Sequence, residues 1–174
     1  MSNNVESREP RILDCGPQRL IGISRICATP VDCHNVWADE NGFLARVGEI
    51  QARAGQTPYY GLCRCAQGAK MGDFEYMAAA PATDGAPVPE GMTEIIVPAG
   101  AYAEFPVAGL DDIGPVWGYT GEWLAASREW QGFCDGNPDG CGCVDNPSFE
   151  LYPPGFDGSG GLFIYVPIRP SLGK

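Results

Sequence analysis

The chain has 174 residues, a net charge of −11 at neutral pH and a pI near 4.3. This length suits one domain with a substantial core, and 44% hydrophobic against 19% charged residues argues against a disordered chain. Lys and Arg form no cluster, which disfavours direct binding to nucleic acid. An acidic field attracts cations, although an acidic surface also serves solubility alone.

Residues 1–10 are polar and are expected to form a flexible tail without the apolar core of a secretory signal. They are too few to hold a helix-turn-helix, so we expect a stand-alone domain over 11–174. No run approaches the roughly 18 apolar residues of a membrane span. With no signal, the eight cysteines predict reduced thiols and a cytoplasmic protein.

The first half predicts strands within 11–29, a helix over 36–54, strands at 59–65 and 74–80, and a Pro-rich linker over 81–91. The helix is expected because apolar residues recur on one face before Gly55. These residues are Trp37, Leu44, Val47, Ile50 and Ala54.

The second half predicts the same order of elements. They are strands at 93–97 and 102–107, a helix from Asp111 or Asp112 to about Trp130, a Cys-rich insertion over 132–146, and strands at 149–152 and 162–168. Each half thus reads as strand, helix, strand, strand. Hairpin-like spacing of the last two strands predicts an α+β fold, with an antiparallel sheet and both helices on one face.

Matching residues support an internal duplication, with repeats over about 11–80 and 92–170. An offset of 80 residues aligns Trp37 with Trp117. An offset of 89 aligns Gly61 with Glu150, and Phe74 and Tyr76 with Phe163 and Tyr165. The extra residues fall most simply in the Cys-rich insertion.

Glu150 is the carboxylate of the strand Pro147–Tyr152, which is otherwise rich in aromatic and apolar residues. Strand side chains alternate, so Glu150 and Tyr152 are expected on one face and Phe149 and Leu151 on the other. A carboxylate on the wet face of a half-buried sheet is ordinary. The repeat, however, has no acid at the matching position.

Four short motifs in order resemble the GyrI-like effector-binding domain, over roughly residues 11–170. They are Pro89-Glu90-Gly91-Met92, Val97-Pro98-Ala99-Gly100-Ala101-Tyr102-Ala103, Pro147-Ser148-Phe149-Glu150-Leu151-Tyr152 and Ile164-Tyr165-Val166-Pro167-Ile168-Arg169. In that family the domain occurs alone and as the drug-sensing half of AraC-type and MerR-type regulators. The resemblance implies a cleft between the two helices, at the pseudo-two-fold axis of a duplicated fold.

The resemblance also implies that the cleft binds lipophilic, often cationic, aromatic compounds, with Glu150 as the counter-ion. A buried carboxylate is costly unless it is paired, and a delocalised organic cation also stacks on aromatic rings. The candidate walls are Trp37, Tyr102, Phe105, Trp117, Tyr119, Trp123, Tyr152 and Tyr165. For each of them, packing in the core is the competing interpretation.

The cysteines depart from the family pattern. The candidate ligands for zinc or another soft metal are the paired thiols Cys63 and Cys65 and Cys141 and Cys143, with Cys134, Cys33 and His34 as possible further ligands. A C-x-C pair is a weaker signal than the usual zinc knuckle. Unliganded thiols, a disulfide within 134–143 and the absence of any cofactor therefore remain open.

Two other functions remain open as well. Some GyrI-like proteins hydrolyse cyclopropane-containing genotoxins, and by resemblance Glu150 would then polarise water as a general base. Otherwise no residue is predicted to be catalytic. The third class is a protein-interaction module, whose acidic surface would meet DNA gyrase or another basic partner.

Overall fold

Nine strands and three α-helices make up the part of the chain that the computed structural model describes, residues 9–50, 57–66, 70, 72–133 and 145–172. The strands are β1 Arg11–Cys15, β2 Gln18–Cys27, β3 Tyr59–Cys65, β4 Phe74–Pro81, β5 Thr93–Val97, β6 Gly100–Val107, β7 Trp130–Gly132, β8 Ser148–Tyr152 and β9 Leu162–Pro170. The helices are α1 Pro30–Ala38, α2 Phe43–Arg46 and α3 Ile113–Ala126, with short 3-10 turns η1 Val47–Glu49 and η2 Leu110–Asp112.

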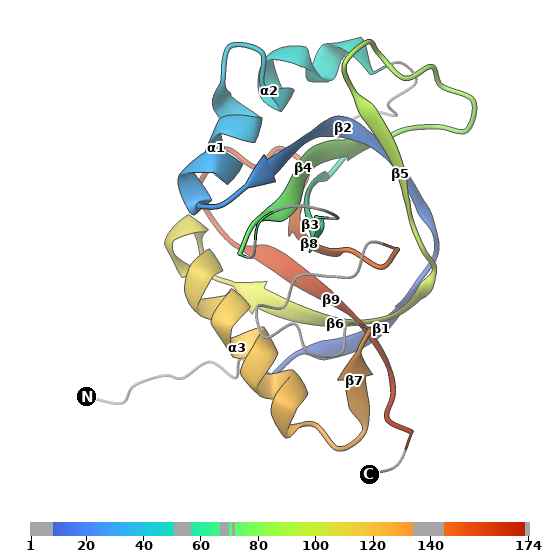
Figure 1. The fold of residues 1–174 in the computed structure, drawn as a ribbon, viewed down its shortest axis with the longest axis vertical. Coiled ribbons are helices and arrows are strands. Elements are labelled where there is room, and N and C mark those ends of the chain that lie inside the picture. Colours follow the sequence, from blue (N-terminus) through green and yellow to red (C-terminus); the bar gives the residue numbers. More distant parts are fainter. Residues whose placement is uncertain (1–8, 51–56, 67–69, 71, 134–144, 173–174) are drawn as a thin grey trace.

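The strands form one curled antiparallel sheet in the order β1-β6-β9-β8-β3-β4-β2-β5, with β7 paired to β9 (Figure 1). This order is symmetric about the β3–β8 pair, where Gly61 lies opposite Glu150 as the aligned repeats predict. Helix α1 packs on β2 and β4, and α3 packs on β6, β7 and β9, so both lie on one face of the sheet. The predicted α+β fold is confirmed.

Alternation along the strands gives the sheet two buried faces. The face beneath the helices holds two apolar clusters, one under α1 around Val36 and Phe43 and one under α3 around Phe105. The opposite face is buried by the curl of the sheet itself. Its cluster contains Tyr102 and Phe149, and the Phe149 ring stacks on Tyr165 with centroids 4.8 Å apart.

The single helix expected over 36–54 is wrong for the described residues. Thr29 caps α1, which begins at Pro30, six residues before the expected start, and ends at Ala38. The chain then turns so tightly at Gly42 that a Cβ there would lie 2.9 Å from the backbone of Asp39 and of Trp37. Only α2 and η1 follow, and residues 51–54 lie outside the described part.

The repeat alignment of the last strand is also wrong. Gly61 pairs with Ala78, whereas Glu150 pairs with Ile164, so Tyr76 and Tyr165 are not equivalent. Tyr76 belongs to the cluster beneath α1, and Tyr165 belongs to the cluster on the opposite face. The physical reason is the length of the two hairpins, because Ala78 follows its partner Gly61 by 17 residues, whereas Ile164 follows its partner Glu150 by only 14.

None of the helices in the described ranges is long and apolar enough to cross a membrane.

Candidate ligand-binding cleft

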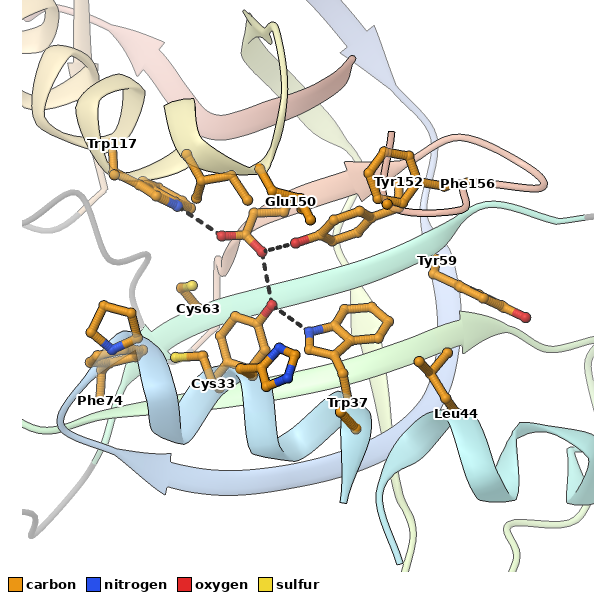
Figure 2. A pocket seen from close by; sticks show the side chains of 18 of the residues that line it. Cys33, Trp37, Leu44, Tyr59, Cys63, Phe74, Trp117, Glu150, Tyr152 and Phe156 are labelled. Carbon is orange, nitrogen blue, oxygen red and sulfur yellow. Dashed lines mark hydrogen bonds between the residues drawn. The ribbon is translucent and has the colours of Figure 1, made fainter. Parts of the chain in front are cut away.

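A cavity of about 1140 Å³ lies between α1 and α3, above β3, β4 and β8 (Figure 2). Its walls are mainly apolar and aromatic. Helix α1 contributes Pro30, Cys33, His34, Trp37 and Ala38, the start of α3 contributes Ile113, Gly114 and Trp117, and the strands contribute Tyr59, Cys63, Cys65, Phe74, Tyr76, Glu150 and Tyr152. We call this cavity the cleft.

The Glu150 carboxylate is held in the cleft by three neutral donors (Figure 2). Its Oε2 accepts hydrogen bonds from the hydroxyls of Tyr76, at 2.8 Å, and Tyr152, at 2.7 Å. Its Oε1 accepts one from the indole Nε1 of Trp117 at 3.0 Å. Glu150 is only 5% exposed, and this burial raises the pKa of its carboxyl group although the three hydrogen bonds oppose the rise.

A second layer of contacts fixes Tyr76. Trp37 Nε1 donates to the Tyr76 hydroxyl at 2.9 Å, so α1 reaches the carboxylate through one intermediate residue while α3 reaches it directly. Gly61 leaves space for this contact, because a Cβ there would lie 2.6 Å from Glu150 Oε2 and closer still to the Tyr76 hydroxyl. The space over Gly61 is therefore filled by protein groups and is not open to a ligand.

Glu150 differs from the other buried acid of the described chain in its partners. Glu104 is 4% exposed, but it forms an ion pair with Arg11 and accepts a hydrogen bond from the Tyr165 hydroxyl. Within the described residues, Glu150 has no such ion pair. A buried carboxylate is costly unless it is paired, so Glu150 keeps part of a desolvation cost that the ion pair of Glu104 offsets.

The structure brings some of the predicted wall residues to the cleft. Trp37, Trp117 and Tyr152 line it together with Glu150. The Trp37 and Tyr152 rings also meet edge to face, with centroids 5.1 Å apart. The two tryptophans come from the facing helices, as their places in the two repeats predict.

The other five candidates lie away from the cleft, and Tyr165 is one of them, in the cluster on the opposite face of the sheet. Tyr102 is 1% exposed on the opposite face of the sheet, and its hydroxyl donates to the Pro98 carbonyl. Tyr119 and Trp123 of α3 each pack edge to face on the buried ring of Phe105. Their positions are those of core residues, the alternative that the sequence left open.

Tyr76 lines the cleft although it was not among the predicted wall residues. In the strand register Tyr76 lies opposite Cys63, which is two residues from Gly61, the partner of Glu150. Tyr76 and Glu150 therefore lie on the same, helix-covered face of the sheet. The incorrect alignment with Tyr165 hid this signal. Leu44, Tyr59 and Phe74 also line the cleft and carried no motif that separated them from ordinary core residues.

Three cysteine thiols, those of Cys33, Cys63 and Cys65, also line the cleft. Burial raises the pKa of Cys33, and the neighbouring Cys27 thiol adds to this rise. No group of three or more metal-ligating side chains gathers among the residues that can be placed. The other metal candidates, Cys134, Cys141 and Cys143, lie outside the described residues, so the zinc hypothesis stays untested.

The fold and the cleft define a small-molecule binding domain, and sequence comparison identifies its family. Residues 8–134 match the profile of the GyrI-like small molecule binding domain. This match spans more than half of the chain, which therefore belongs to that family. It ends before Glu150, so the placement of that residue rests on the strand register and the contacts described above. No curated protein sequence matches the chain.

Solved structures with the same fold include one that holds a bound small molecule. SAV2435 bound to tetraphenylphosphonium is 16% identical and aligns with a TM-score of 0.60 over 92% of this chain and 94% of its own. A putative transcription regulation protein from Staphylococcus aureus MU50 is 15% identical, with a TM-score of 0.62 over 94% and 99% of the two chains. EcmrR in its complex with DNA is 9% identical, with a TM-score of 0.64 over 92% of this chain and 57% of its own.

Proposed function

We propose that this protein binds lipophilic aromatic cations in the cleft, with the Glu150 carboxylate as their counter-ion, and that it sequesters or senses these compounds. The observation that carries the proposal is the contrast between the two buried acids. Glu104 has Arg11 as its partner, whereas among the described residues the partners of Glu150 are three neutral hydrogen-bond donors.

A cation in the cleft would supply what Glu150 lacks. Attraction between opposite charges is strong where water is excluded, and a cation that is itself poorly hydrated gives up little by entering. Trp37, Trp117 and Tyr152 present aromatic rings beside the carboxylate. The negative faces of such rings attract cations. The net charge of −11 attracts cations to the surface in addition.

The similarity to SAV2435 supports the proposal, because that protein is bound to tetraphenylphosphonium, an aromatic cation. The second candidate function is hydrolysis, and the raised pKa of Glu150 is the observation that favours it. A general base works best when its pKa lies nearer neutrality than that of an exposed carboxyl group.

The direct test is a fluorescence titration of the reduced protein with cationic aromatic dyes and with neutral dyes of similar shape. We expect the cations to bind and Glu150→Gln to weaken them by about 10- to 100-fold, because the variant keeps the shape of the side chain and removes its charge. Glu122→Gln is the matched control, since Glu122 is exposed on α3 and lies outside the cleft.

Equal binding of cations by the wild type and by Glu150→Gln would contradict the counter-ion role. Chromatography of the recovered dye or of a cyclopropane-containing compound separates binding from hydrolysis, since only hydrolysis returns a product. Failure of every dye to bind would refute the small-molecule proposal for this panel and would direct the search to a protein partner.

A further inference from the structure

The hydrogen bonds at Glu150 leave the carboxylate with little capacity for new donors. An ionised carboxylate offers about four lone-pair positions on its two oxygens. Tyr76 and Tyr152 occupy both positions on Oε2, and Trp117 occupies one on Oε1. About one position therefore remains for a ligand.

The donors are also fixed in place. Tyr76 is 2% exposed, its oxygen already accepts the Trp37 indole N–H, and it lies in the space that a Cβ at Gly61 would fill. Tyr152 is on the strand of Glu150 itself and is packed between the rings of Trp37 and Phe156. Turning either hydroxyl away would leave a buried donor without a partner.

We propose that Tyr76 and Tyr152 make the cleft selective for cations without polar hydrogens, such as quaternary ammonium and phosphonium ions, over primary ammonium and guanidinium ions on the same aromatic skeleton. This inference rests on the proposed function. It assigns a role to the uncharged side chains of Tyr76 and Tyr152, which limit the number of hydrogen bonds that Glu150 can accept from a ligand.

The two kinds of cation differ in what they require from the cleft. A primary ammonium has three N–H donors, of which Glu150 can accept about one, while the others would face aromatic rings. A quaternary ion requires only the negative charge and the π surface. The other acids that line the cleft, Asp73 and Asp157, are half-buried and exposed, so there water competes for the same donors.

The test uses two matched probes, (2-naphthylmethyl)trimethylammonium and 2-naphthylmethylammonium, titrated at pH 7 where both are cations. We expect the wild type to bind the quaternary probe at least about tenfold more tightly, the cost of one unpaired buried donor. Removing one hydroxyl in Tyr152→Phe frees a position on Oε2 for one further donor of the primary ammonium, so the ratio of the two dissociation constants should fall by about tenfold.

The change in this ratio is the decisive quantity, because the extra methyl groups of the quaternary probe contribute equally in every variant. Tyr119→Phe removes a hydroxyl outside the cleft and should leave the ratio as in the wild type. Tyr76→Phe should also lower the ratio. It leaves the Trp37 N–H without its acceptor, so Tyr152→Phe decides the test if Tyr76→Phe does not fold.

An unchanged ratio in Tyr152→Phe would overturn the selectivity inference while leaving cation binding in place. A wild type that prefers the primary ammonium would overturn it as well. If neither probe nor any other cation binds, the proposed function itself fails, and the two failures are thereby distinguished.

Discussion

Glu150 receives its three hydrogen bonds from three separate parts of the fold. Tyr76 comes from β4, Trp117 from α3 and Tyr152 from β8. These bonds offset part of the cost of removing the carboxylate from water, but the pKa of Glu150 is still raised by burial. The free protein thus keeps a costly acid at the site where a cation would relieve that cost.

Gly61→Ala tests the space between Glu150 and Tyr76. The new methyl group would lie 2.6 Å from Glu150 Oε2, so the Tyr76 hydroxyl or the carboxylate must move. We expect a loss of about 1–3 kcal/mol in the free energy of unfolding, measured by urea titration, and a loss of cation binding.

Gly100→Ala is the matched control for this substitution. Gly100 is also a strand residue, and nothing lies within 4 Å of the position of its Cβ. Its unfolding free energy should change by less than about 0.5 kcal/mol. Equal stability and equal binding of Gly61→Ala and the wild type would show that the Tyr76–Glu150 contact is not as close as described.

At the scale of elements, α1 carries Trp37 and Cys33 to the cleft, and its start is defined by a capping box. The Thr29 hydroxyl accepts from the Asp32 backbone N–H at 3.3 Å, and the Asp32 carboxylate accepts from the Thr29 backbone N–H at 2.9 Å. Pro30 follows at a position where its missing donor costs nothing.

Thr29→Ala removes half of this box. We expect the free energy of unfolding to fall by about 1 kcal/mol and cation affinity to fall as α1 becomes less firmly placed. Thr83→Ala is a suitable control, because Thr83 is exposed in a turn. If Thr29→Ala and Thr83→Ala have the same free energy of unfolding in thermal and urea titrations, the capping box does not stabilise α1.

Both helices were predicted, but with unequal accuracy. The second was expected from Asp111 or Asp112 to about Trp130, and α3 runs over Ile113–Ala126. The first was placed by the spacing of apolar residues alone. This spacing continues past Ala38, where α1 ends. The pattern Thr29-Pro30-Val31-Asp32 was available as a start signal and would have moved the helix toward its observed position.

At the scale of the whole molecule, a symmetric scaffold carries an asymmetric site. The helices and the β3–β8 pair follow the symmetry, and Trp37 and Trp117 point into the cleft from opposite sides. Their N–H groups nevertheless reach different acceptors, the Tyr76 hydroxyl and the Glu150 carboxylate. A second acid at Gly61 would place two carboxylates side by side, where like charges repel.

The repeats made much of this arrangement predictable from the sequence. They aligned Gly61 with Glu150 and Trp37 with Trp117, and the structure places both pairs about the symmetry axis. Tyr76 was not predictable, because connections of different length shift the register between the repeats. Tyr102 was misplaced for a different reason: a sheet that curls enough to bury its second face needs aromatic residues there too.

The measurement that tests the central claim most directly is the proton release on binding tetraphenylphosphonium. It is obtained by calorimetry in buffers of different ionisation enthalpy, for the wild type and Glu150→Gln. Burial raises the pKa of Glu150 above its ordinary value of 4.5, so below that raised pKa the free protein holds a proton there. A bound cation favours the ionised form and expels the proton.

We therefore predict that the wild type releases up to one proton per bound cation as the pH falls through the raised pKa of Glu150, and that its affinity weakens over the same range. Glu150→Gln keeps every other residue that lines the cleft and should lack this release. Tight binding with the same proton release and the same affinity in both proteins would contradict the account.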